Sequence, residues 1–161
     1  MIIILMGVAG SGKTTVGRLL ASELGWHFAE GDDCHPRANI EKMQHGIPLT
    51  DDDRWPWLQA LREVIDVCLA HGTSAVMTCS ALKQTYRDYL IGDRDALKLV
   101  YLKGTYDLFY QRLAQRQGHC MPKELLTSQF ATLEEPQQEL IVAAADTPQA
   151  LVAVIRKALQ V

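Results

Sequence analysis

A glycine-rich loop between a short apolar run and a helical pattern constrains the fold of this chain more than any other feature. Residues 7–14 read Gly-Val-Ala-Gly-Ser-Gly-Lys-Thr, which matches the pattern G-x-x-x-x-G-K-[ST]. The run before the loop, residues 2–6, is typical of a buried parallel strand, and residues 14–24 after it carry apolar side chains at helical spacing. A strand, this loop and a helix in that order predict a site for the phosphates of a nucleoside triphosphate.

Each kind of residue in the loop has a chemical role. The glycines allow backbone dihedrals that side chains forbid, so that the amide groups can approach an anion closely. Lys13 is expected to reach the β- and γ-phosphates, and the hydroxyl of Thr14 is expected to ligate a magnesium ion. The predicted nucleotide contacts in this stretch are Gly7, Val8, Ala9, Gly10, Ser11, Gly12, Lys13, Thr14 and Thr15.

Length and composition limit what else the chain can be. The 161 residues suffice for one domain, residues 1–161, whose core needs no disulfide or metal. A net charge of −3 without any lysine- and arginine-rich block argues against a nucleic-acid partner, and no apolar run approaches the roughly 20 residues that span a bilayer. The first apolar run is too short for a secretory signal, and the four cysteines are scattered without a C-x-x-C pair. We therefore expect reduced thiols and a cytoplasmic protein.

Strand and helix signals alternate along the rest of the chain, as a parallel sheet with crossover helices requires. We expect a three-layer α/β fold of the P-loop kinase type, with a five-stranded parallel sheet, helices on both faces and a small helical lid. Because the crossovers are right-handed, the loops that follow the strands gather at one edge, where ligands bind. After the strand, loop and helix at the N-terminus, the expected strands are residues 27–29, 75–79, 98–102 and 140–144. The expected helices are one that is capped by Asp53 and ended by Gly72, one over residues 106–116 and one over residues 148–159.

The residues after the second and third strands distinguish between classes of nucleotide-binding protein. Glu30, Asp32 and Asp33 follow the second strand, where one acid can hold magnesium or its waters and another can accept a proton from an attacking hydroxyl. The alternative is an acidic turn in solvent, which Asp33 taken alone slightly favours. Residues 79–83 contain no acid where a motor ATPase would carry one, and the chain has no N-K-x-D sequence of a GTPase. These absences favour a kinase for a small acceptor.

Two arginines are expected to belong to a mobile lid. Arg112 and Arg116 lie one turn apart on an expected helix, just before a stretch that contains Gly118 and Pro122. Two guanidinium groups on a flap suit the charge that spreads over a phosphoryl group during transfer, although a solvated basic helix end would carry the same residues. We expect a lid over about residues 112–130 that closes over the nucleotide, excludes water and brings Arg116 onto the phosphates.

The sequence resembles the gluconate kinases (gluconokinases), P-loop kinases of a sugar acid that are related in fold to shikimate and adenylate kinases. The resemblance covers nearly the whole chain, and its most specific stretches separate gluconate kinases from shikimate kinases. Those stretches include Glu30-Gly31-Asp32-Asp33-Cys34-His35-Pro36, Gly46-Ile47-Pro48-Leu49-Thr50 with the run through Leu58, Ser80-Ala81-Leu82-Lys83, and Gly118-His119 with Met121-Pro122.

The resemblance implies transfer of the γ-phosphoryl group of ATP, with Mg²⁺, to the 6-hydroxyl of D-gluconate. Asp32 matches by position the acid that contacts the acceptor hydroxyl in shikimate kinases, and is therefore the expected base. Glu30 matches the neighbouring acid, where magnesium waters are held. Arg54 lies where relatives use an arginine on the substrate, and the fork of a guanidinium group suits a carboxylate.

Other residues could hold that carboxylate instead, and these alternatives stay open: His35, Lys83 and Arg87. The remaining expected substrate contacts are Ser80 and Gln129. Asp146 and Pro148 resemble the loop that touches adenine in nucleoside-monophosphate kinases, and Arg112 matches the lid arginine that stacks on the base. Relatives are often dimers, so a homodimer is an expectation as well. Two rival hypotheses remain: the protein is a kinase of another small hydroxylated acid such as shikimate, or it is a nucleotide-binding switch without kinase chemistry.

Overall fold

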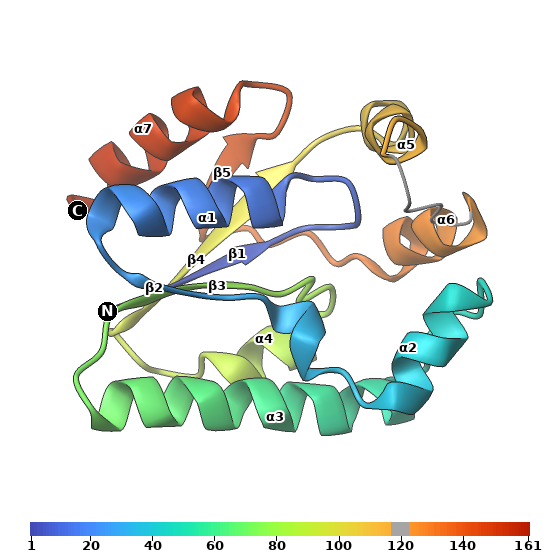
Figure 1. The fold of residues 1–161 in the computed structure, drawn as a ribbon, viewed down its shortest axis with the longest axis horizontal. Coiled ribbons are helices and arrows are strands. Elements are labelled where there is room, and N and C mark those ends of the chain that lie inside the picture. The colour runs from blue at the N-terminus through green and yellow to red at the C-terminus, as the bar shows by residue number, and fades with distance from the viewer. Residues whose placement is uncertain (117–122) are drawn as a thin grey trace.

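A parallel sheet lies between two layers of helices in the computed structural model, which describes residues 1–116 and 123–161 (Figure 1). The strands are β1 (Ile2–Met6), β2 (His27–Ala29), β3 (Ala75–Thr78), β4 (Leu97–Lys103) and β5 (Leu140–Ala143). The helices are α1 (Lys13–Leu24), α2 (Arg37–Gln44), α3 (Asp51–Ala70), α4 (Gln84–Leu90), α5 (Tyr106–Ala114), α6 (Lys123–Thr132) and α7 (Pro148–Leu159), and a short 3-10 helix, η1 (Gly31–Cys34), follows β2. The five strands run in the order β2-β3-β1-β4-β5 and all neighbours are parallel. The expected fold class is confirmed.

The central strand β1 is buried on both faces, which explains why its sequence is apolar without alternation. Successive side chains point to opposite faces of a strand. Ile3 and Leu5 accordingly pack in one core with residues of α1 and α7, whereas Ile4 and Met6 pack in a second core with residues of α3 and α4. Figure 1 shows the same division, with α1 and α7 over one face of the sheet and α3 and α4 over the other.

The start of α3 differs from the sequence prediction. Thr50, not Asp53, is the N-cap: its hydroxyl oxygen accepts from the backbone N–H of Asp53 at 3.2 Å. The carboxylate of Asp53 in turn accepts from the backbone N–H of Thr50 at 2.9 Å, which completes a capping box. Asp53 resembled an N-cap in sequence because aspartate is common at both positions, and only the reciprocal hydrogen bonds distinguish them.

Two helices, α2 and α4, were not predicted at all, and α6 was expected only as part of a small helical lid without bounds of its own. Each has at most ten residues, and a short helix of mixed polarity has too weak an apolar period to be recognised in sequence. The predicted helix over residues 106–116 ends earlier, at Ala114, so Arg116 lies beyond the regular helix. The strands predicted at 75–79 and 140–144 each end one residue earlier, and the one at 98–102 extends by one residue at each end.

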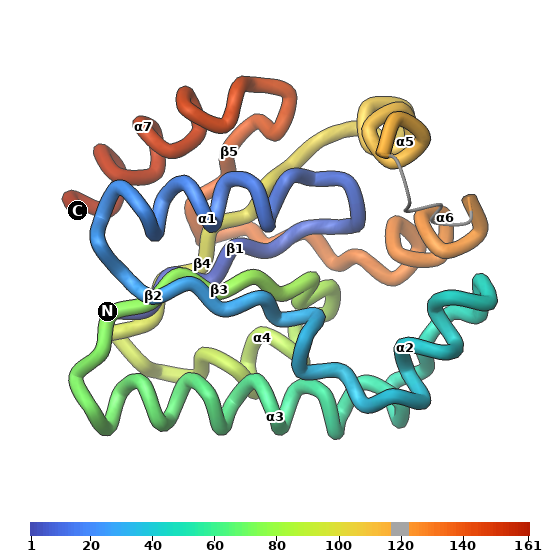
Figure 2. Tube along the Cα trace, viewed as in Figure 1, coloured from blue at the N-terminus to red at the C-terminus, as the bar shows by residue number. Residues whose placement is uncertain are grey.

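The loops that follow the strands meet at one end of the molecule. Figure 2 shows the turn between β1 and α1 reaching toward the end where α2, α5 and α6 lie, while both chain termini are at the opposite end. A parallel sheet places the carboxyl ends of all its strands at one edge, where ligands bind. A ligand site is therefore expected at this edge of the sheet. No helix within the described ranges combines the length and apolar character needed to cross a membrane.

The capping box of α3 gives a prediction about stability. Thr50→Ala removes the hydroxyl that caps the helix and should lower the free energy of unfolding by about 1 kcal/mol, the usual effect of losing such a cap. Urea unfolding followed by circular dichroism measures this change. Thr85→Ala, at an exposed position inside α4, is the matched control and should leave the midpoint nearly unchanged. Equal effects of the two substitutions would contradict a capping role for Thr50.

Candidate active site

The loop between β1 and α1 leaves backbone amides free to bind an anion. Gly12 occupies the N-cap position of α1 in a left-handed conformation (φ 96°), and no described side chain caps the helix there. Gly10 is also left-handed (φ 78°), and a Cβ atom at that position would lie 2.8 Å from the carbonyl oxygen of Phe109. Neither conformation suits a residue with a side chain, so the glycines of the motif are required by the backbone path. The positive end of α1 and its uncapped amides form the expected phosphate cradle.

Lys13 and Thr14 begin α1 and point to two different groups of oxygen atoms. The ammonium group of Lys13 donates to the carbonyl oxygens of Gly7 and Val8, at 2.9 and 3.1 Å. The hydroxyl of Thr14 donates to one carboxylate oxygen of Glu30 at 2.6 Å. The other oxygen of Glu30 accepts from the hydroxyl of Thr78, at the end of β3. The two residues predicted to ligate or water-bridge a magnesium ion, Thr14 and Glu30, are thus in direct contact.

No larger metal-binding cluster supports this pair. Within the described part of the chain, histidine, cysteine, aspartate and glutamate nowhere gather in groups of three or more that could hold a metal ion. One carboxylate and one hydroxyl fit Mg²⁺, which keeps several of its waters and takes further oxygen ligands from nucleotide phosphates. The donor set therefore fits a nucleotide-dependent magnesium ion and does not fit a tightly held structural metal.

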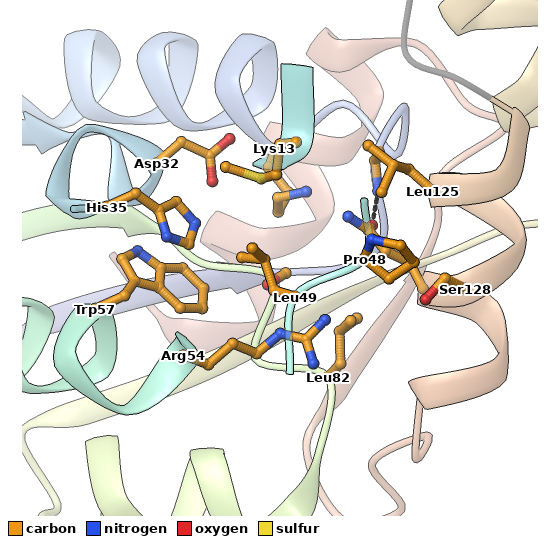
Figure 3. A pocket seen from close by; sticks show the side chains of 14 residues that line it. Lys13, Asp32, His35, Pro48, Leu49, Arg54, Trp57, Leu82, Leu125 and Ser128 are labelled. Atoms are coloured by element: carbon orange, nitrogen blue, oxygen red, sulfur yellow. Dashed lines mark hydrogen bonds between the residues drawn. The ribbon is translucent and has the colours of Figure 1, made fainter. Parts of the chain in front are cut away.

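A cavity beside the loop collects most of the predicted substrate residues (Figure 3). It is lined by Ala9, Lys13, Asp32, His35, Met43, Pro48, Leu49, Arg54, Trp57, Ser80, Leu82, Leu125, Ser128 and Gln129. These residues come from α1, η1, α2, α3 and α6 and from the loops after β1, η1, α2 and β3, so distant parts of the chain converge on it. We call it the acceptor cavity. A lysine and an aspartate face it from one side and an arginine from the other, as Figure 3 shows for Lys13, Asp32 and Arg54.

Burial and their opposite charges affect the pKa values of Lys13 and Asp32. Burial lowers the pKa of the Lys13 ammonium group, and the negative charges of Asp32 and Glu30 oppose that shift. Asp32 keeps solvent contact in the open cavity, yet the protein atoms around its carboxyl group remove hydration and raise its pKa, against the opposing charge of Lys13. Loss of hydration disfavours the charged form of each group. A carboxylate made more basic in this way is better suited to accept a proton.

Arg54 is the cation on the far side of the acceptor cavity. It lies in the first turn of α3, is 8% exposed, and donates to the hydroxyl of Tyr86 at 3.4 Å. Tyr86 donates in turn to the carboxylate of Asp51. No carboxylate of the described residues forms an ion pair with Arg54 itself. Its guanidinium group is therefore oriented by an aromatic neighbour and keeps its charge for an anion in the cavity.

A second cavity lies on the other side of the phosphate loop. It is lined by Gly10, Ser11, Gly12, Thr15, Val16, Arg112, Arg116, Ala144, Asp146, Pro148 and Leu151. We call it the nucleotide cavity, because it combines the helix N-terminus with the loop after β5. Arg112 is fixed there by a 2.6 Å hydrogen bond from its guanidinium group to the carbonyl oxygen of Ala144. The predicted base-side residues Arg112, Asp146 and Pro148 are thus brought together.

The lid can be followed only in part. Arg116 lines the nucleotide cavity and is exposed. Gly118 and Pro122, the expected pivots, lie outside the described residues, so lid closure stays a prediction. On the far side of that stretch, α6 contacts the phosphate loop directly, because the carboxamide oxygen of Gln129 accepts from the backbone N–H of Ala9 at 2.7 Å. The α6 side of the expected lid therefore borders the acceptor cavity, and its Arg116 side borders the nucleotide cavity.

Comparison with known proteins decides the family. A family model described as an AAA domain matches residues 2–140. The chain is 44% identical over 161 residues to the thermoresistant gluconokinase of Escherichia coli (strain K12), covering 99% of this chain and 92% of that protein. It is 50% identical over 134 residues to the gluconokinase of Gluconobacter oxydans (strain 621H), covering 83% and 75%. The chain belongs to the gluconokinase family. The crystal structure of a gluconokinase from Sinorhizobium meliloti 1021 also matches, with a TM-score of 0.83 at 43% identity over 98% of this chain and 94% of that one.

Two predicted substrate residues of this gluconokinase family member lie away from the acceptor cavity. Lys83 forms an ion pair with Asp51 at 2.9 Å, at the start of α4. Arg87 is 2% exposed, and its guanidinium group donates to the backbone carbonyl oxygens of Ala81, Leu82 and Glu134. The expectation that Arg87 holds a substrate carboxylate is not supported by this geometry, because the group is buried and both terminal nitrogens of its guanidinium group already donate to protein oxygens. The residue instead ties α4 to the segment after α6.

Several cavity residues were not predicted: Met43, Pro48, Leu49, Leu82, Leu125 and Ser128. They are small or apolar and carry no chemical signal of their own. Trp57 both packs in the core and faces the cavity: it is 1% exposed, lines the acceptor cavity and donates from its indole nitrogen to the carbonyl oxygen of Gly31 at 2.8 Å. The family strings that contain Pro48, Leu49 and Leu82 were the available sequence signal for these positions.

The contacts of Arg87 predict a structural effect. Arg87→Met keeps an unbranched stem but removes the guanidinium donors and leaves buried carbonyl oxygens without a partner, and should lower the free energy of unfolding by about 2–4 kcal/mol. Urea unfolding is the measurement. Arg37→Met, at an exposed position in α2, is the matched control and should change stability by less than about 0.5 kcal/mol. An unaltered midpoint in Arg87→Met would show that these hydrogen bonds contribute little.

Proposed function

We propose that this protein transfers the γ-phosphoryl group of ATP to the 6-hydroxyl of D-gluconate and produces 6-phospho-D-gluconate and ADP. The observation that carries the proposal is the meeting of Lys13, Asp32 and Arg54 in one cavity beside the phosphate loop. Gluconate has a carboxylate at one end and the reacting hydroxyl at the other, so its site needs a cation and a base that are separated. Arg54 and Asp32 supply these two groups, and membership of the gluconokinase family agrees with this substrate.

In this proposal the side chain of Asp32 accepts the proton of the 6-hydroxyl as that oxygen attacks the γ-phosphorus. The bond between the γ-phosphorus and the bridging oxygen breaks, and ADP leaves with that oxygen. Lys13 and Arg116 balance the negative charge that spreads over the transferring group, which is the main contribution a protein makes to phosphoryl transfer. Arg54 holds the gluconate carboxylate in a bidentate pair and so fixes which hydroxyl reaches Asp32.

The remaining predicted residues orient the nucleotide and metal. Thr14 and Glu30 would hold Mg²⁺, directly or through its waters, and the ion would neutralise charge on the phosphates. Arg112, Asp146 and Pro148 would contact the adenine side of ATP in the nucleotide cavity. Two cavities on either side of one phosphate loop favour a kinase over a nucleotide-binding switch, because a switch has no need of an acceptor site with a base.

The first test is substrate choice. In an assay that couples ADP release to a spectroscopic signal, we expect turnover with gluconate well above that with other sugar acids or shikimate. Lys13→Ala should lower kcat by orders of magnitude while the fold survives, which shows that the signal comes from this site. Greater turnover of another acid would assign the cavity to that acceptor. Absence of turnover with every acid, with ATP still bound, would favour the switch.

The role of Asp32 is tested by Asp32→Asn, which keeps the size of the side chain and removes its basic oxygen. We expect kcat to fall by roughly 10²-fold or more, because general-base catalysis contributes about 10²–10⁴-fold. Asp33→Asn is the matched control, since Asp33 is an exposed acid in the same 3-10 helix and does not line the acceptor cavity. A change in KM alone would make Asp32 a binding residue and leave the base to be found elsewhere.

A further inference from the structure

His35 has a fixed orientation in the acceptor cavity. Its ring is stacked on the indole of Trp57, with ring centroids 4.2 Å apart and planes inclined by 14°. Trp57 is itself held by the hydrogen bond from its indole nitrogen to the carbonyl oxygen of Gly31. His35 is 9% exposed and lines the cavity, and Figure 3 shows its ring directed into it between Asp32 and Trp57. Only the position of its proton is left to determine.

Asn39 determines that position. The side-chain nitrogen of Asn39 lies 2.8 Å from the carbonyl oxygen of Asp53. A carbonyl oxygen only accepts hydrogen bonds, so the amide must present its NH₂ group there and not its oxygen. The same nitrogen lies 3.2 Å from Nδ1 of His35. An amide NH₂ group only donates, so Nδ1 must be the acceptor and a neutral ring must carry its proton on Nε2.

We propose that Asn39 is a positioning residue that holds His35 as the Nε2–H tautomer, so that the acceptor cavity offers a neutral hydrogen-bond donor to a hydroxyl oxygen of the substrate. The inference rests on the proposed function, because it takes a polyhydroxylated acid as the occupant. It also decides an alternative that the sequence left open. A neutral His35 offers the substrate carboxylate no positive charge, so Arg54 is the better partner for that group.

The electrostatic surroundings agree with a neutral ring. Burial, and to a smaller extent the positive charge of Arg54, together lower the pKa of His35 to about 4. The charged groups that share the cavity with His35 are Arg54 of α3, Lys13 of α1 and Asp32 of η1. A second positive charge beside Arg54 would be repelled, whereas a neutral donor is not. The cavity then has distinct partners for the distinct groups of the substrate: a cation, a neutral donor and a base.

The tautomer is measured directly by long-range ¹H–¹⁵N correlation NMR of the whole protein labelled at histidine nitrogens, near pH 7. We expect His35 to show a protonated Nε2 and an unprotonated Nδ1. Asn39→Asp replaces the donor with a carboxylate, which accepts from Nδ1–H, so the proton should move to Nδ1 and the pKa of His35 should rise. Gln44→Glu, an amide-to-acid change at an exposed position of the same helix, is the control and should leave the His35 signals unchanged. A protonated Nδ1 in the unaltered protein would overturn the inference.

The kinetic test asks whether the donor recognises a hydroxyl. Asn39→Asp should raise KM for gluconate by about 10- to 100-fold with a smaller effect on kcat, because a mismatched hydrogen-bonding group then faces the substrate. The same measurement is repeated with monodeoxy analogues of gluconate, each of which lacks one hydroxyl. Asn39→Asp should change KM little for the analogue that lacks the hydroxyl contacted by His35, because that contact is already missing. An equal rise in KM for every analogue, or no rise for gluconate, would overturn hydroxyl recognition.

A further pair of variants covers the case in which Asn39→Asp does not fold. The carboxamide nitrogen of glutamine can reach the Nε2 position and that of asparagine the Nδ1 position, so His35→Gln should keep more gluconate affinity than His35→Asn. The reverse order would contradict an Nε2 donor. A protein that binds ATP but does not turn over gluconate would refute the proposed function, whereas the NMR measurement would still report the tautomer.

Discussion

The burial of β1 at the centre of the sheet is the constraint on which the rest of the structure depends. Its five residues have no exposed surface, and the strand is paired on both sides, with β3 and β4. The phosphate loop continues directly from this strand into α1, so its ends are fixed by the most rigid part of the molecule. Gly17 allows α1 to approach the sheet closely: a Cβ atom there would lie 2.8 Å from the ring of Phe28. Helix and strand thus hold the loop before any ligand binds.

The end of β3 fixes the acidic side of the site in a similar way. The hydroxyl of Thr78 accepts from the backbone N–H of Gly31 at 3.0 Å and donates to the carboxylate of Glu30. Gly31 itself lies so close to the strand that an added Cβ atom would be 1.9 Å from the carbonyl oxygen of Thr78. The 3-10 helix that carries Asp32 is therefore held against the sheet by its backbone. One threonine hydroxyl connects the predicted metal side of the site with its predicted base.

The opposite side of the acceptor cavity is organised around Asp53. Its backbone carbonyl oxygen accepts from Asn39, and its carboxylate accepts from the backbone N–H of the N-cap Thr50 and from the ammonium group of Lys42 at 2.8 Å. The hydrogen bond from Lys42, and after it those from Thr50, lower the pKa of the Asp53 carboxyl group to about 2. Asp53 therefore joins α2 to α3. His35 is hydrogen-bonded to Asn39 of α2, and Arg54 follows Asp53 in α3, so the positions of these two side chains relative to each other are fixed. The orientation of the two cavity-facing donors thus depends on a residue that does not itself line the cavity.

The sequence by itself determined the phosphate loop, the apolar strands and the longer helices, because these depend on local spacing and on backbone conformations that only certain residues adopt. It also determined the gluconokinase family, through strings such as residues 30–36 and 46–58. Which of the cationic residues lines the acceptor cavity was decided only by the tertiary structure. Arg54 and Arg87 are both arginines, but Arg54 lines the acceptor cavity, whereas Arg87 donates to the carbonyl oxygens of Leu82 and Glu134. Hydrogen bonds between residues far apart in sequence leave no local pattern, so the tautomer of His35 and the structural role of Arg87 emerge only when the chain is folded.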